Sequence, residues 1–270
     1  IESQIKRQFG GLSLPPNAPQ RRYYPVADNK RMITHVMRDA EQPIALAHLY
    51  MKRDVKPTSV RSSERYQQEI YGHDLICLML NERLSKQQSG AKAPFTAASV
   101  KDGKFLIVQT KKAFSLSVSC KGDQIEAGLS AAVGLLEQAR QWGFTTGELT
   151  RAKAILRNKA ERCNNQRGQL ANHHYVKQCL DHYLYGEPIL STAEELHVRR
   201  KFDAELTLAD VNTAIKELVT DRNQVLLLYA PKKADFRVPS TEQLERCVRG
   251  AQKKSYPAYQ ECVRPKMLLT

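Results

Sequence analysis

The stretch that most constrains the fold is a predicted pair of helices joined by a tight turn, over residues 122–166. In its first half small residues alternate with apolar residues at three-to-four-residue spacing, namely Ile125, Leu129, Val133, Leu136 and Trp142. This spacing predicts a long amphipathic helix with a closely packed face. Gly143 stands where a helix end needs a residue that tolerates a left-handed backbone. Thr145 and Glu148 then predict a capping box that opens the second helix.

The second helix is predicted to carry a narrower apolar stripe, made of Leu149, Ala152, Leu156, Ala160 and Cys163. Basic residues between these positions, such as Arg151 and Lys153, are expected to face water. Taken by themselves, these patterns describe a structural helix pair and no chemistry.

Composition narrows the class of protein. The chain has 270 residues, 41% hydrophobic and 26% charged, which fits one large or two small globular domains. Its longest apolar runs, such as 225–230, are far shorter than the roughly 20 residues that a membrane-spanning helix needs. The net charge of +14 could attract nucleic acid. The basic residues are dispersed along the chain, however, and are not interleaved with aromatic residues, so we expect no nucleic-acid partner.

Along the chain, residues 1–29 hold a short helical start followed by a breaker-rich linker. Strands are predicted at 31–37 and 44–51, as a pair that opens the sheet, and at 224–230. Three more, at 96–100, 105–110 and 114–121, are expected to be adjacent and antiparallel, with a turn at Asp102 and Gly103. Further helices are predicted at 60–87, 170–185, 193–201 and 207–219, and around 242–253 within a polar tail.

Four stretches of the chain resemble a known family. They are the helix pair with Gly143-Phe144-Thr145, Glu148-Leu149 and Arg151-Ala152-Lys153; Asn81-Glu82-Arg83-Leu84; Ala93-Pro94-Phe95 with Ala98-Ser99; and 206–211 with Asn223 and the strand after it. Together they are similar to non-catalytic domains of the pitrilysin/insulinase family of zinc metallopeptidases, over roughly residues 26–232.

The resemblance implies an α+β domain at 30–232, with a mixed, mostly antiparallel sheet backed by helices on one face. Residues 1–29 would then be a linker from a preceding domain, and 233–270 a linker with a helical tail towards a following one. The chain has no initiator Met and begins within a helical pattern, which suggests a piece of a longer polypeptide.

The catalytic domains of that family carry His-x-x-Glu-His, which supplies zinc ligands and a base. Helix 60–87 is the expected counterpart of the motif-bearing helix, but it offers only Tyr71-Gly72-His73-Asp74. Strand 114–120 also lacks the arginine and tyrosine with which the family holds substrate. The resemblance therefore implies the second domain of an N-terminal half, without a catalytic, cofactor-binding or metal site of its own.

Other metal-binding and catalytic patterns in the sequence are incomplete or absent. His73 with Cys77, and His174 with Cys179 and His182 beside His173, lie at helical spacing, yet neither set completes a ligand pattern, so we expect no metal. No nucleophile elbow and no phosphate-binding glycine loop occurs in the sequence. The six cysteines, at 77, 120, 163, 179, 247 and 262, are expected to be buried single thiols and not a disulfide framework.

The expected function is therefore structural: a domain that helps to enclose the substrate chamber of a zinc endopeptidase acting on peptides. Zinc is expected in the preceding domain, and the expected partners are that domain, the following half of the same polypeptide and the peptide substrate. A non-enzymatic assembly subunit of the same fold, as in respiratory-complex core proteins, is the alternative. A basic nucleic-acid-binding protein of another fold is a third hypothesis.

Overall fold

The structure is a computed structural model that describes residues 1–19, 22–90, 93–120, 122 and 124–261. In these ranges the strands are β1 (Ile33–Asp39), β2 (Ala45–Asp54), β3 (Ala97–Lys104), β4 (Lys111–Cys120) and β5 (Gln224–Pro231). The helices are α1 (Glu2–Phe9), α2 (Thr58–Arg61), α3 (Glu64–Gln88), α4 (Ile125–Trp142), α5 (Thr146–Asn165), α6 (Asn172–Tyr185), α7 (Thr192–Glu205), α8 (Leu208–Leu218) and α9 (Thr241–Lys253), with a 3₁₀ turn at Arg167–Gln169.

The described strands form one sheet in the order β1-β5-β2-β4-β3. Only β1 and β5 run parallel, and the other three pairings are antiparallel. The predicted mixed, mostly antiparallel sheet of an α+β fold is thus confirmed. The expected opening pair is wrong in one respect, because the last strand, β5, inserts between β1 and β2.

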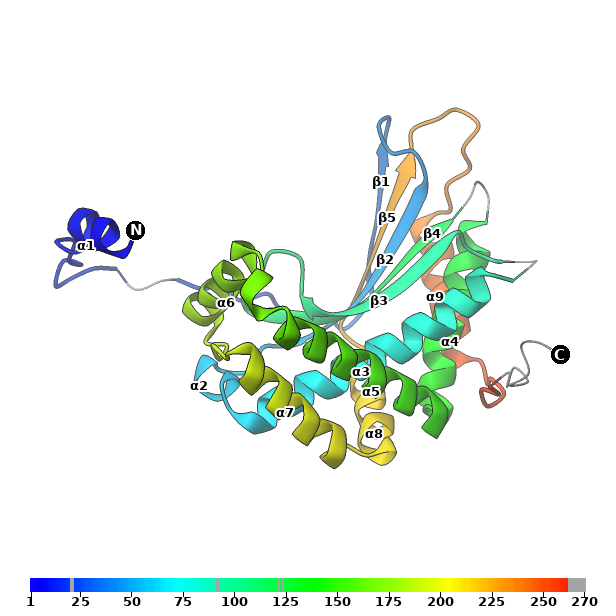
Figure 1. Cartoon of the computed structure of the whole chain (residues 1–270). Helices are drawn as coiled ribbons and strands as arrows, with labels where there is room; N and C mark the ends of the chain where they lie inside the picture. The colour runs from blue at the N-terminus through cyan, green and yellow to red at the C-terminus, as the bar shows by residue number, and fades with distance from the viewer. Residues whose placement is uncertain (20–21, 91–92, 121, 123, 262–270) are drawn as a thin grey trace.

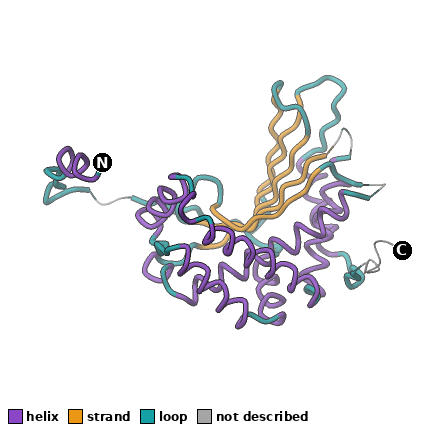
Figure 2. Tube along the Cα trace, in the orientation of Figure 1, coloured by secondary structure: helices purple, strands orange, loops and turns teal. Residues whose placement is uncertain are grey.

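One face of the sheet is covered by helices, and the other, which we call the open face, is covered only in part, where Phe105 of the loop after β3 packs with Ala113 and Val225. Figures 1 and 2 show the helices gathered on one side of the strands. Along β2, alternate residues Ala45, Ala47, Leu49 and Met51 are buried under α3 and α4, as the pleat requires. Their neighbours Leu46, His48 and Tyr50 point to the other face and are only partly covered. Figure 1 also places α1 apart from the sheet.

The predicted helix hairpin is confirmed at its turn. The Thr145 hydroxyl accepts from the Glu148 backbone N–H, and the Glu148 carboxylate accepts from the Thr145 N–H. Gly143 has φ +75° and ψ −157°, which is not the expected left-handed helical cap but a region that is almost restricted to glycine. Trp142 is also not part of the packed face, because 58% of it is exposed.

Two boundaries differ from the sequence prediction. The turn expected at Asp102 and Gly103 lies inside β3, because both residues pair with β4 and the Asp102 carboxylate is held by Arg53 and His73. The strand expected at 105–110 is the connecting loop, so the expected three-strand arrangement is a hairpin of β3 and β4. The helix expected at 60–87 is divided at Ser63, whose hydroxyl caps α3.

The helix predicted within a polar tail belongs to the main core. Leu244, Val248 and Ala251 of α9 are buried, and α9 packs on α4 and on β1. Residues 254–261 continue as an extended segment that contacts the helix hairpin, while the last residues of the predicted tail, 262–270 with Cys262, lie outside the described residues. Among the described helices, none is long and apolar enough to cross a membrane.

Candidate functional site

His73 lies on α3, the helix that the sequence resemblance led us to expect as the counterpart of the motif-bearing helix. Its Nδ1 lies 2.9 Å from Asp102 Oδ2, and the same oxygen accepts from Arg53 at 2.5 Å. Burial alone would raise the pKa of Asp102, but the hydrogen bond from His73 and the charge of Arg53 outweigh it, so the pKa is lowered. His73 therefore serves a buried ion-pair cluster, which sequence reasoning missed because it placed Asp102 in a turn.

The two candidate metal sets are not assembled into ligand clusters. Burial raises the pKa of the Cys77 thiol to about 12, so Cys77 does not provide a thiolate beside His73. On α6, His182 Nδ1 lies 2.8 Å from the Glu187 carbonyl oxygen, and Cys179 is exposed. No group of three or more potential ligands with metal-binding geometry occurs in the described ranges. The described cysteines are free thiols, as predicted, although only Cys120 is fully buried.

The open face of the sheet presents side chains of all five described strands. A row of residues crosses it in register, from His35 on β1 through Leu227, His48 and Ser117 to Ser99 on β3. The β1-β5-β2 side is apolar and aromatic. The β4 side is a ladder of hydroxyls, contributed by Ser115, Ser117 and Ser119.

His48 and Ser117 are the only pair on this face that could suggest nucleophilic catalysis within the described residues. Nδ1 and Oγ lie 2.8 Å apart, and burial lowers the pKa of His48, which favours the neutral imidazole. No described carboxylate contacts His48; its ring instead stacks on Tyr50 and meets Tyr229 edge-on. His48 thus has no acid to orient it and lies on a sheet face, so its contact with Ser117 fits surface packing better than catalysis.

A cavity of about 790 Å³ opens beside the end of the β3–β4 hairpin, bounded by α3, α6 and α7. Its walls include Arg61, Tyr71, Lys104, His174 and Phe202. His174, one of the candidate metal ligands, therefore lies at a cavity and not at a metal centre. Sequence reasoning did not find this cavity, because its wall residues come from segments more than 100 positions apart.

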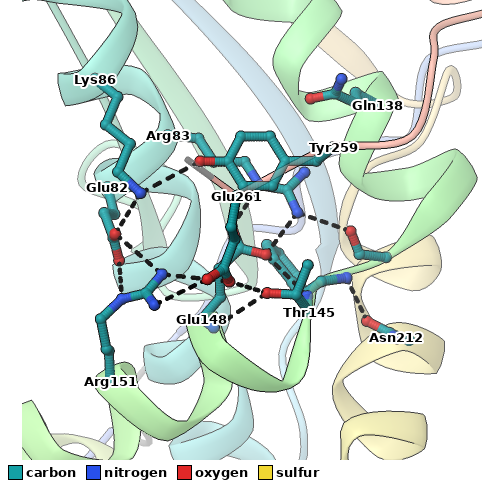
Figure 3. A network of polar contacts seen from close by, with 12 residues as sticks. Glu82, Arg83, Lys86, Gln138, Thr145, Glu148, Arg151, Asn212, Tyr259 and Glu261 are labelled. Carbon is teal, nitrogen blue, oxygen red and sulfur yellow. Dashed lines mark hydrogen bonds and ion pairs between the residues drawn. The ribbon is translucent and has the colours of Figure 1, made fainter. Parts of the chain in front are cut away.

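The turn of the helix hairpin holds a polar junction (Figure 3). Arg83 donates from Nε and Nη2 to both carboxylate oxygens of Glu148, at 2.7 and 2.8 Å, and from Nη2 to the Gly143 carbonyl at 2.9 Å. Asn212 accepts from the Phe144 N–H at 2.8 Å. Motif residues of two separate stretches thus meet at one point together with Asn212 of α8, and their role here is to hold helices together.

The extended segment 254–261, which we call the strap, covers this junction. Tyr259 lies over Arg83, with 4.1 Å between the guanidinium carbon and the ring centroid, and Glu261 bonds Thr145 and Arg151. Tyr256 is held through its main chain by Gln141 and by the indole N–H of Trp142. Trp142 is therefore exposed on one side, while its indole N–H is held by the main chain of the strap.

Comparison with known structures identifies the fold: it is that of pitrilysin/insulinase-type (M16) protease domains, as the sequence resemblance implied. The first half of the periplasmic protease PqqL from Escherichia coli matches with a TM-score of 0.81 and 17% identity, over 96% of this chain and 55% of that one. The complete PqqL protease matches over 100% of this chain and 29% of its own, with a TM-score of 0.79 and 17% identity.

A third similar structure is described as non-catalytic. The M16 peptidase inactive domain from Pseudomonas fluorescens has a TM-score of 0.56 and 17% identity, over 84% of this chain and 49% of that one. The chain thus spans about half the length of the half-protease structures that it matches. No protein-family model matches the sequence, and no curated protein is significantly similar to it.

Proposed function

We propose that this chain is a non-catalytic domain that helps to enclose the peptide chamber of a zinc metalloendopeptidase. The observation that carries the proposal is the fold match over 96% of the chain to half of a protease, combined with a sequence that lacks His-x-x-Glu-His. The zinc ion and its base would lie in a preceding domain of the same polypeptide. The following half would complete the chamber.

The arrangement of the sheet supports this role. A rigid sheet, backed on one face by a continuous helical core, presents its other face without a helix over it in Figure 1. That open face offers aromatic rings and hydroxyl groups, which can contact peptides of many sequences through apolar surface and hydrogen bonds. Such a surface suits a wall against which substrates rest, because it does not demand one side chain.

The test is reconstitution with the preceding domain, produced separately. We expect the two to associate at tens of micromolar concentration and the mixture to show more chelator-sensitive peptidase activity than the zinc domain alone, since binding stabilises the catalytic domain. A preceding domain without an intact His-x-x-Glu-His, or association without any gain in activity, would favour an assembly subunit instead. Tight, salt-sensitive binding of DNA or RNA with no association would overturn the proposal.

A further inference from the structure

The cavity beside the β3–β4 hairpin contains a buried charge that has no counter-charge. Arg61, the last residue of α2, is only 8% exposed and lines the cavity. Its Nε donates to the Lys56 carbonyl at 2.8 Å and its Nη1 to the Tyr185 carbonyl at 3.1 Å. No carboxylate in the described part of the chain lies within ion-pair distance of it. Buried guanidinium groups are normally paired, so an anion is the missing partner.

The balance of charge around the cavity points the same way. Arg199 pairs with Asp74 and Glu195, and Lys177 pairs with Asp181, so these two cations and three acids leave one surplus negative charge. The described wall residues include four further cations. Lys111 is held by Asp28 and Asp54, which are not wall residues. The other three, Lys101, Lys104 and Lys112, have no carboxylate partner in the described ranges. With Arg61, four cations then face Glu187, which has no cationic partner, and the surplus negative charge beside Arg199, so the wall keeps a net positive charge.

Two of these lysines are poised over aromatic rings instead of acids. Lys104 Nζ lies 3.5 Å from the centroid of the Tyr185 ring, and Lys112 Nζ donates to the Tyr66 hydroxyl at 2.7 Å. Both contacts leave the ammonium group able to attract an anion, because a ring or a hydroxyl does not neutralise its charge. Lys101 and Lys104 are exposed on the β3 side of the cavity and can move without disturbing the core.

A second unsatisfied group lies in the same wall. His174 Nε2 is buried and has no hydrogen-bond partner among the described residues, and His174 lines the cavity from α6. Apolar side chains such as Val198, Phe202 and Leu190 complete the walls. A volume of about 790 Å³ lies within the range of pockets that hold small ligands or a few residues of a peptide.

We propose that this cavity binds a carboxylate-bearing segment of a peptide, with the carboxylate held by Arg61 and Lys104 and its neighbouring side chains against the apolar walls. This inference rests on the proposed function, because it names acidic peptides as the class that the domain selects. A hydrogen bond from or to His174 Nε2 would satisfy the second group. The bound segment would therefore be chosen by its charge at this cavity.

The experiment is fluorescence anisotropy on the whole chain with three labelled peptides of equal length, which differ only in carrying glutamate, glutamine or lysine. Two double variants of equal charge change are compared: Lys101→Ala with Lys104→Ala at the cavity, and Lys216→Ala with Arg249→Ala at the far end. Lys216 and Arg249 are exposed and, like the first pair, have no carboxylate partner in the described ranges. Inorganic phosphate is titrated as a competitor.

We expect the glutamate peptide to bind best, and the cavity variant to lower its affinity about tenfold, because it loses the charge-assisted contact to Lys104 and the nearby charge of Lys101. The far-end variant should change the affinity for the glutamate peptide less than about twofold, because those two charges act on the cavity only through screened, long-range electrostatics. Arg61→Lys keeps the positive charge but loses the planar guanidinium that can donate two parallel hydrogen bonds to a carboxylate. It should therefore lower the affinity for the glutamate peptide more than the affinity for the glutamine peptide.

Equal weakening by both double variants would overturn the proposal, because net charge alone would then explain the binding. Equal affinity for the glutamate and glutamine peptides would also overturn it, while leaving a chamber domain that binds peptides. Equal displacement of the glutamate and the glutamine peptides by phosphate would mean a free oxyanion site and would also overturn the proposal. Failure of all three peptides to bind, together with failure of the reconstitution, would count against the proposed function itself.

Discussion

Arg83 on α3 and Glu148 on α5 form a two-pronged ion pair in which each side chain is only 1% exposed. Arg83 Nη1 has no acceptor among the described residues, and its guanidinium plane is instead enclosed by the rings of Phe144 and Tyr259. The pair joins the Asn81–Leu84 stretch to the helix hairpin. Because both charges are removed from water, each depends on the other for compensation.

Removal of one partner should therefore be costly. Arg83→Met would leave the Glu148 carboxylate buried without a cation, and we expect the free energy of unfolding to fall by roughly 3–5 kcal/mol. Replacing both residues, Arg83→Met with Glu148→Met, should cost less than the single change, since no buried charge remains. Urea denaturation of the three proteins measures this, and a single variant within about 1 kcal/mol of the parent would contradict it.

The hairpin turn should not tolerate a side chain at Gly143. Its φ of +75° and ψ of −157° disfavour any L residue, and an added Cβ would lie 2.4 Å from Asn212 Cγ. We expect Gly143→Val to cost about 3 kcal/mol. Gly168→Val is the matched control, because a Cβ there meets nothing within 4 Å. Equal denaturation midpoints for the two variants would mean that the turn geometry is wrong.

The strap should be sensitive to the glycine beneath it. A Cβ at Gly134 of α4 would lie 2.9 Å from the Tyr256 hydroxyl, whereas at Gly250 of α9 it meets nothing. Glycine to alanine within a helix normally stabilises by about 1 kcal/mol, and we expect Gly250→Ala to do so. Gly134→Ala should instead loosen the strap and speed tryptic cleavage after Lys254. Unchanged cleavage in Gly134→Ala would show that the strap is not seated there.

Stability should depend on pH through Asp102. Its folded-state pKa is lowered, so the unfolded chain binds the proton more readily, and the stabilisation is present above the unfolded value of about 3.9 and lost as pH falls through the folded value. Asp102→Asn should therefore lower stability at neutral pH and flatten its decline in acid. Guanidinium denaturation from pH 7 downwards tests this, and parallel pH curves for the two proteins would refute it.

The purified chain should hydrolyse no peptide, with or without added zinc, because the sequence lacks the ligand set and its base. A fluorogenic peptide assay with a chelator control measures this. Chelator-sensitive turnover that persists through successive purification steps would place an active site in this chain and remove the basis for a non-catalytic role.

The sequence indicated those parts of the fold that depend on neighbouring residues. The capping box of Thr145 and Glu148, the glycine at 143 and the buried positions Leu129 and Val133 could be recognised, because helix ends and helix faces are set by contacts within a few positions. The same local reasoning failed at Asp102, where a turn-forming dipeptide is held in a strand by Arg53 and His73. A distant ion pair there outweighs local turn preference.

The candidate sites were even less accessible to sequence reasoning. Arg61 shares a wall with His174. Arg61 does not stand out along the chain and His174 stood out only as a possible metal ligand, since the cavity is created only when α2, α6 and the β3–β4 hairpin are packed together. Glu261 and Tyr259 were likewise assigned to a tail, although they close the junction around Arg83. These contacts join residues separated by more than 100 positions, which no periodic pattern records.

By itself the sequence determined the helix hairpin and the lack of a His-x-x-Glu-His motif, because both follow from residue types at short, fixed spacing, and its resemblance to a known family implied the α+β class. Only the tertiary structure decided the strand order with β5 between β1 and β2, the place of α9 in the core, the strap and the cationic cavity. The physical reason is that strand pairing, burial and charge compensation depend on which surfaces meet in space, and that choice is made by the whole chain at once.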